Sequence, residues 1–195
     1  KGNAQLLETP ITEFMSDILV NVKASTSELK DHGHALIWEL NKISPNLLLY
    51  VMPELEKELT VEDEEKREDT VALLGKMFAS DGSRMITSYP QLFNTFLKRF
   101  NDVEASIRRR MVEYATEFIQ NLPSLDLADN LFTRVRDTDE GVRAAAVKAI
   151  CAAASANPIR FKKDVLQEVG MRMRDKKVWR VLNTTHTHTH TTALV

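Results

Sequence analysis

Cysteine, glycine and proline are scarce in this chain. Its 195 residues contain one cysteine, six glycines and six prolines. The single cysteine, Cys151, excludes an internal disulfide and indicates a reducing compartment. So few glycines and prolines favour long regular elements, because these two residues interrupt helices and strands. Apolar runs stay shorter than the roughly 18–20 residues that a membrane-spanning helix needs, so no such helix is expected.

The sequence also lacks the short motifs of common enzymes. It has no glycine-rich phosphate loop, no CxxC pair and no HExxH. The acidic run from Val61 to Asp69 lacks the glycine and alternating ligands of a calcium loop, and is predicted to be the solvated start of a helix. His32 and His34 would face different directions on a helix, so a joint metal site is not expected. The prediction is a protein that is not an enzyme and holds no metal.

The two ends of the chain read differently from its middle. The first residue is Lys1 rather than methionine, which suggests a piece excised from something longer. Near the other end, His186, His188 and His190 alternate with threonine, a pattern that resembles a purification tag. We therefore expect a folded segment at residues 1–181 and a non-native or disordered tail at 182–195.

Charge is distributed unevenly along the chain. Residues 1–97 hold 9 Lys and Arg against 16 Asp and Glu, whereas residues 98–195 hold 17 against 12. The first half is therefore acidic and the second half basic. This division favours partners with charged surfaces and says nothing about the fold.

Apolar residues recur with helical spacing almost throughout. Ile11, Phe14, Ile18 and Val22, for example, occupy one face of a helix. No convincing strand is found. The helices predicted from this spacing and from capping signals lie at about 11–22, 25–41, 48–59, 63–79, 90–100, 103–121, 124–136, 139–155 and 161–174.

Two segments repeat the same chemistry at an interval of 35 residues. "LKRFNDVEASIRRRMV" at 97–112 and "FTRVRDTDEGVRAAAV" at 132–147 each carry an aspartate followed six residues later by an arginine, Asp102 with Arg108 and Asp137 with Arg143. Helix pairs that repeat at about this period form HEAT-type solenoids. The predicted fold is an all-α solenoid of about four and a half antiparallel helix hairpins. These four residues are predicted to form a structural ladder between repeats, with the aspartates capping the second helices.

Basic residues are numerous in the second half of the chain. Taken singly, each is explained by a solvated helix face. Taken together, residues at equivalent positions of stacked repeats would line up, and the candidate partner-binding stripe consists of Lys98, Arg99, Arg109, Arg110, Arg134 and Arg136. Because no aromatic residues are interleaved to stack on bases, an acidic protein segment is favoured over single-stranded nucleic acid.

Four stretches carry a family resemblance: "SPNLLLYVMPELEKEL", "VALLGKMFAS", "FLKRFNDVEASIR" and "MRMRDKKVWRV". They resemble the N-terminal half of the cohesin-associated HEAT-repeat regulators named for precocious dissociation of sisters. The resemblance covers about residues 5–181. It ends after Val181, where the family would continue into another basic helix.

This resemblance implies a nuclear, chromatin-associated scaffold that is not an enzyme. Such a protein would bind the kleisin subunit of cohesin, and either the release factor Wapl or its antagonist sororin, and would contact chromatin only indirectly. It would not read nucleic-acid sequence. The resemblance also implies binding of inositol hexakisphosphate by lysines and arginines, with no position assigned here. A nuclear-transport solenoid that carries cargo peptides and a phosphatase-type scaffold remain open alternatives, because HEAT repeats serve all three.

Overall fold

A computed structural model describes residues 9–10, 13–14, 32–43, 48–49, 51–80, 82–122, 125–156, 161–174 and 176. Within these ranges every regular element is a helix and no strand occurs. Most of the predicted helix at 11–22 lies outside the described residues, and so does the whole of the tail at 182–195. In the described part of the chain, no helix is both long and apolar enough to cross a membrane.

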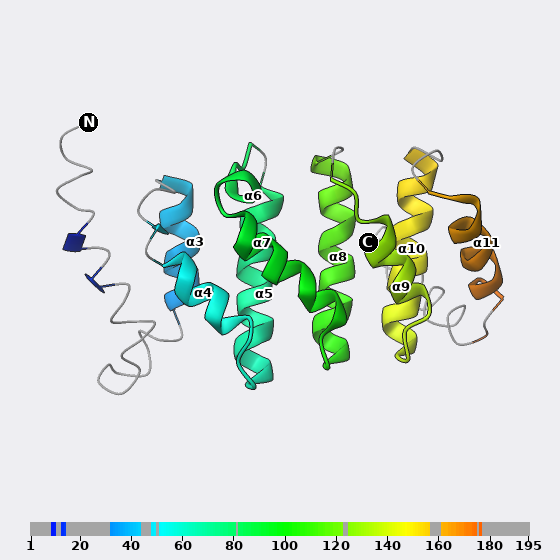
Figure 1. The fold of residues 1–195 in the computed structure, drawn as a ribbon, viewed down its shortest axis with the longest axis horizontal. Coiled ribbons are helices and arrows are strands. Elements are labelled where there is room, and N and C mark those ends of the chain that lie inside the picture. The colour runs from blue at the N-terminus through cyan, green and yellow to red at the C-terminus, as the bar shows by residue number, and fades with distance from the viewer. Residues whose placement is uncertain are drawn as a thin grey trace, which may run out of the picture. The chain divides into compact units, whose positions relative to one another are not determined.

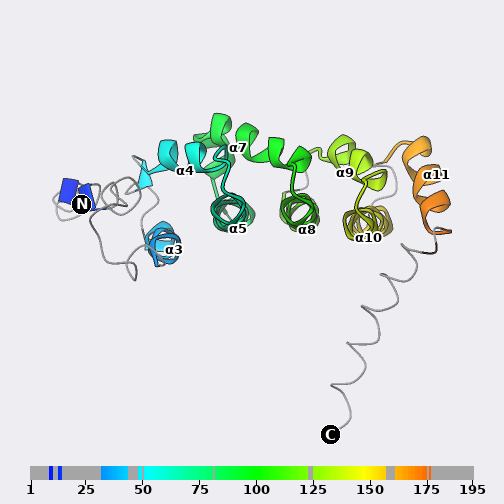
Figure 2. The same ribbon diagram turned by 90° about the horizontal axis from the view of Figure 1, so that it is seen from below.

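The chain divides into two compact units, residues 1–98 and 99–195, which are described separately. The helices described in unit 1 are α3 (Gly33–Ile43), α4 (Met52–Glu58), α5 (Glu64–Ala79), α6 (Met85–Ser88) and α7 (Pro90–Leu97). Helix α5 packs against both α3 and α4, and α4 also packs against α7. Within this unit α3 and α5 form one layer, and α4 and α7 form the other (Figures 1 and 2).

Local sequence explains where the helices of unit 1 begin. The Asp63 carboxylate accepts a hydrogen bond from the Lys66 amide at 3.1 Å and so caps α5, as the acidic run predicts. Pro53 and Pro90 lie in the first turns of α4 and α7, where a missing N–H costs nothing. The layers meet in a core that includes Phe78, Phe93 and other fully or largely buried side chains.

Unit 2 contains α8 (Ala105–Asn121), α9 (Ala128–Val135), α10 (Glu140–Ala156) and α11 (Lys163–Arg172). The short 3₁₀ helix η2 (Lys98–Asn101) begins at the last residue of unit 1 and continues into unit 2. Helix α10 packs against both α8 and α9, and α9 packs against α11. Helices α8 and α10 lie in one layer, and α9 and α11 in the other (Figure 2). Ile107, Met111, Ala115 and Phe118 are fully buried at the three- to four-residue spacing of one helix face.

The fold is an α-solenoid built from HEAT-type antiparallel helix hairpins, which confirms the predicted class. Some element boundaries differ from the prediction. The expected helix at 90–100 is divided into α7 and η2, and the one at 124–136 begins only at Ala128. Asp126 accepts a hydrogen bond from the Ala128 amide at 3.0 Å, which holds the preceding turn outside the helix. The four-residue helix α6 was not predicted, since it is too short to show a periodic pattern.

Candidate functional site: the arginine ladder and the basic surface of unit 2

Arg108 joins two successive repeats of unit 2. Its Nε donates to Asp137 Oδ2 and its Nη2 to Asp137 Oδ1, each at 2.8 Å. Its Nη1 donates to the backbone carbonyls of Asp102 at 2.8 Å and Val103 at 2.9 Å. The two charged side chains are both buried. Paired donors that match a carboxylate are among the stronger hydrogen bonds in proteins, so this arginine links α8 firmly to the turn before α10.

The contact of Arg108 with its own turn recurs at two other arginines. Arg143 Nη1 donates to the carbonyls of Asp137 and Thr138, both at 2.9 Å. In unit 1, Arg67 Nη1 donates to the carbonyls of residues 61 and 62, at 2.8 Å and 2.7 Å. In all three cases the acceptors lie six and five residues before the arginine. The repeated spacing in the sequence therefore corresponds to one repeated geometry.

The ladder aspartates hold turns rather than cap helices, which differs from the prediction. Asp102 Oδ1 accepts the Glu104 amide at 3.0 Å, and α8 begins only after Glu104. Asp137 Oδ1 likewise accepts the Asp139 amide at 2.9 Å. The capping contact of α10 comes from Asp139 instead, which accepts the Val142 amide at 2.9 Å. Each ladder aspartate lies two residues before the N-cap position of its helix. Its side chain therefore stabilises the preceding turn and does not cap the helix.

The pKa of Asp137 follows from these contacts. Burial by itself raises the pKa of this carboxyl, but the hydrogen bond from Arg108, the Asp139 amide and the charges of Arg108 and Arg134 outweigh it. The net effect is a pKa below the ordinary value. The hydrogen bond from Asp137 in turn raises the pKa of Arg108. Both groups are therefore charged at neutral pH.

Two of the six predicted stripe residues belong to the ladder instead of the free surface. Arg99 Nη1 donates to Asp102 at 2.9 Å, and Arg134 Nη1 donates to Asp137 at 2.8 Å. Their side chains are only 21% and 13% exposed. A further bond runs from Arg134 Nη2 to Asn101 Oδ1 at 3.0 Å. The expected row of six exposed cations is thus interrupted, because aspartates three residues along the chain neutralise two of them.

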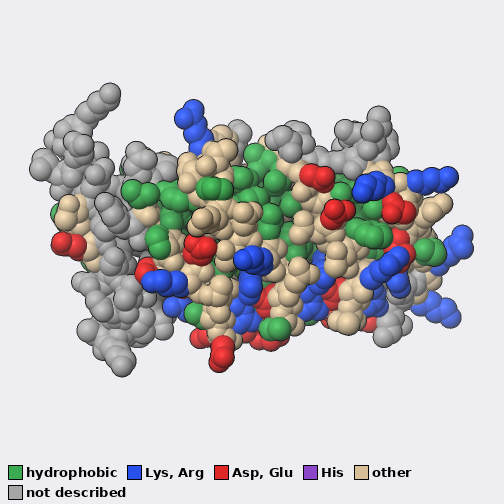
Figure 3. Space-filling model, in the orientation of Figure 1, with side chains coloured by type: hydrophobic (Ala, Val, Ile, Leu, Met, Phe, Trp, Pro, Cys, Tyr) green, Lys and Arg blue, Asp and Glu red, His purple; other side chains and the backbone are tan. Residues whose placement is uncertain are grey.

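The remaining stripe residues are exposed. Arg109 and Arg110 lie on the outer face of α8, at 3.3 Å and 3.5 Å from carboxylate oxygens of Glu113. Arg136 ends α9 and forms an ion pair with Glu168 at 2.7 Å. Lys98 is exposed as well, at the end of unit 1. Lys and Arg side chains are visible around the α11 region of unit 2 in Figure 3.

A buried polar cluster in unit 1 was not foreseen. Glu58, which is 5% exposed, accepts hydrogen bonds from Thr70 Oγ1 and contacts His34 Nε2, both at 3.1 Å. Lys66 Nζ lies 2.9 Å from its other oxygen. The cluster ties α3, α4 and α5 together. Burial by itself raises the pKa of Glu58, but the bonds from and charges of His34 and Lys66 lower it overall.

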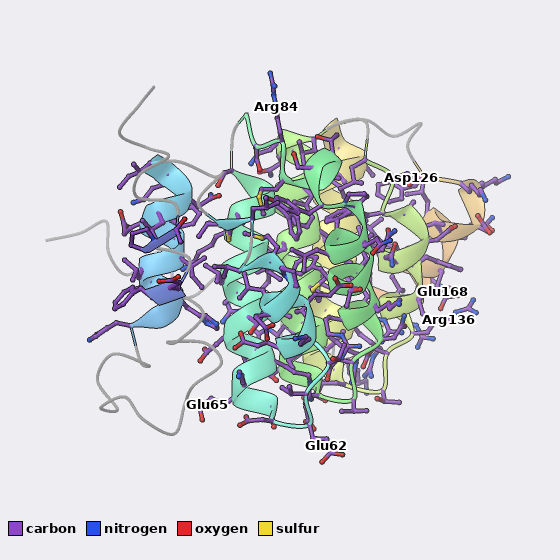
Figure 4. All side chains as sticks on the ribbon, turned by 60° about the vertical axis from the view of Figure 1, so that its left-hand side comes forward. Glu62, Glu65, Arg84, Asp126, Arg136 and Glu168 are labelled. Atoms are coloured by element: carbon purple, nitrogen blue, oxygen red, sulfur yellow. The ribbon has the colours of Figure 1, made fainter. Side chains whose placement is uncertain are left out.

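We predict that replacing Glu58 with glutamine reduces the acid sensitivity of the fold. A carboxyl with a lowered folded pKa stabilises the protein above its unfolded pKa, and this stabilisation is lost as pH falls through the folded pKa. Urea midpoints of the wild-type chain should fall as pH drops from about 5 to about 3, and the E58Q variant should lose less over that interval. Glu65→Gln is the control, because this side chain is exposed and points outward (Figure 4). Parallel pH profiles for all three chains would contradict the prediction.

The histidine and tryptophan side chains singled out in the sequence play lesser parts. His34 faces Glu58, whereas His32 is exposed. Within the described ranges no group of three or more His, Cys, Asp or Glu is placed to hold a metal ion. Trp38 is partly exposed, with Lys42 Nζ 5.6 Å from its ring centroid, while Trp179 lies outside the described residues.

Stacked antiparallel helix hairpins, two of them joined by the Arg108–Asp137 contact, are the architecture of a HEAT-type repeat protein. The sequence model described as "Sister chromatid cohesion protein PDS5 protein" matches residues 1–179. The chain therefore belongs to the PDS5 family of sister chromatid cohesion proteins.

Individual relatives agree with this assignment. The chain is 38% identical over 183 residues to PDS5 homolog A-B of Xenopus laevis and 37% identical to human PDS5 homolog B, in each case over 93% of its own length. It spans 14% and 13% of those proteins. A solved chain from the structure of the Pds5–Scc1 complex has the same fold, with a TM-score of 0.76 at 18% identity, and covers 90% of this chain and 28% of that one.

Proposed function

We propose that this chain is a non-catalytic docking segment of a cohesin regulator and that it binds the kleisin subunit. The observation that carries the proposal is the match of the PDS5 family over residues 1–179. The structural relative was solved in a complex named Pds5–Scc1, which supports a partner of the Scc1 type for this chain too. The role itself would be exerted by the longer protein, on chromatin in the nucleus.

We further propose that the longer protein recruits a Wapl-type release factor or a sororin-type antagonist. Competition between these two would set the balance between release and maintenance of cohesin. Inositol hexakisphosphate is proposed as a ligand of the longer protein, in keeping with the basic second half of this chain. No position in this chain is assigned to it.

The exposed cations of unit 2 are proposed to attract the partner. Arg109, Arg110 and Arg136 remain accessible, and their ion pairs with glutamates are at least partly in contact with solvent. Exposed pairs contribute only about 0.2–1 kcal/mol each, so these residues would act together and mainly raise the rate of association. An acidic segment of kleisin fits such a surface.

Reversing both charges on α8 should weaken kleisin binding. We expect Arg109→Glu with Arg110→Glu to reduce retention of purified kleisin by about five- to tenfold at physiological salt, because two attractive contacts become repulsive. A pull-down with quantified bound kleisin measures this, and circular dichroism checks that helix content is unchanged.

The matched control reverses two exposed cations of unit 1, Lys76 and Arg84, in the same way. Equal losses in both double variants would point to net charge alone and contradict a role for the α8 pair. If the wild-type chain retains a nuclear-transport GTPase instead of kleisin, the proposed function is wrong.

A further inference from the structure

Unit 2 has an open pocket of about 520 Å³ between the end of α9 and α11. It is lined by Arg136, the C-cap residue of α9, and by Glu168, Met171 and Arg172 from α11. The side chains of Arg136 and Glu168 lie together at this edge of the unit in Figure 4. The basic stripe predicted from the sequence included Arg136 but not the three residues of α11.

The charges in this pocket are held in place before any ligand binds. Glu168 Oε2 accepts from Arg136 Nη2 at 2.7 Å, and its Oε1 accepts from Arg172 Nε at 3.1 Å. The Arg136 guanidinium also lies 5.3 Å from the centre of the Phe132 ring. These contacts favour positions of both guanidinium groups beside Glu168, so the arginine side chains would lose less conformational freedom when a ligand binds.

A positive charge remains after these pairs are formed. Two arginines face one carboxylate, and the bonds to Glu168 use one N–H donor of each guanidinium out of five. The Arg136 side chain is 58% exposed, so it has access to an approaching acceptor. The pocket can therefore bind a further carboxylate without breaking the pairs to Glu168.

An apolar side chain borders these cations. Met171 is 59% exposed, and methionine adapts its shape to different apolar partners. Phe132, the aromatic ring beside the pocket, has Arg136 over it. A nucleic-acid base would stack on an open aromatic face, whereas a peptide side chain needs only the methionine. The combination favours a peptide over nucleic acid.

We propose that this pocket binds a segment of the partner in which a carboxylate side chain neighbours a large apolar one. The carboxylate contacts Arg136 and Arg172, and the apolar side chain packs on Met171. The inference rests on the proposed function, since the partner that supplies this segment is kleisin. It adds an apolar contact, which gives the surface a specificity that exposed charges alone do not provide.

The test is the affinity of the full 195-residue chain for purified kleisin, measured by titration calorimetry. Met171→Glu places a negative charge at the pocket without disturbing the core, because the side chain is exposed. We expect the affinity to fall about tenfold or more, as for a central contact of an interface. Met171→Leu keeps the apolar contact and should bind within about twofold of the wild type.

Met173→Glu is the matched control, with the same substitution two residues away. Met173 is 52% exposed and does not line the pocket. The affinity of the M173E variant for kleisin should therefore stay near that of the wild type. If the wild type binds kleisin and the two glutamate variants bind it equally, the pocket inference is overturned while the proposed function stands. If the wild type does not bind kleisin, both are overturned. If M171E binds kleisin as the wild type does but loses affinity for a single-stranded oligonucleotide, the choice of a peptide ligand for this pocket is overturned.

Discussion

Replacing Arg108 with alanine should lower the free energy of unfolding by about 3 kcal/mol. The substitution removes two hydrogen bonds to the buried carboxylate of Asp137 and leaves the carbonyls of Asp102 and Val103 without their donor. A buried charge that loses its partner is more costly than the lost bonds alone. The loss is limited because Arg134 still contacts Asp137 at 2.8 Å.

Urea unfolding followed by circular dichroism measures this change. The neighbouring substitution Arg109→Ala is the control, because Arg109 lies on the same helix but is exposed, and it should change the stability by less than about 0.5 kcal/mol. Equal stability of the two variants would show that the buried ion pair contributes nothing beyond an ordinary surface residue. In that case the ladder would have to be explained by something other than stability.

Replacing Phe78 with alanine should have a larger effect, a loss of about 3–5 kcal/mol. This side chain is fully buried in unit 1. Its ring centre lies 4.9 Å from that of Phe93, edge to face, and 5.3 Å from that of Phe96. Truncation removes these ring contacts and leaves a cavity between α5 and α7, which the surrounding helices fill only in part.

Two further variants make this expectation specific. Phe78→Leu keeps most of the volume and should cost less than about 1.5 kcal/mol. Ile43→Ala truncates an apolar side chain that is exposed at the end of α3, and should change little. A loss for F78A no greater than that for F78L would mean that the aromatic core does not hold this unit together.

The ladder was accessible to sequence reasoning because its geometry is local. Arg108 and Arg143 each donate to the carbonyl of the residue six positions earlier in the sequence. The repeated spacing of six residues therefore predicts this contact. The alignment of the two repeats could also have revealed the roles of Arg99 and Arg134, which the sequence analysis missed. Each stands three residues before its aspartate, and this shared offset would have assigned both of them to ion pairs.

Other features could not be found in this way. The Glu58 cluster brings together side chains from α3, α4 and α5, which no spacing within one segment connects. The pocket at Arg136 likewise depends on how α9 packs against α11. Helical periodicity predicted that these helices exist and which faces they bury. It did not predict which polar residues of separate helices would meet.

The contacts of Arg108 reach both backwards and forwards along the chain, which bears on the order in which the repeats fold during synthesis on the ribosome. Arg108 donates hydrogen bonds to two backbone carbonyls that precede it in the chain and to the carboxylate of Asp137 in the repeat that follows. When α8 has formed, its arginine can already be oriented by its own turn while the partner aspartate is still to be translated. The repeat that contains Asp137 then meets a donor that is already set in position, which favours assembly of these two repeats in the order of translation.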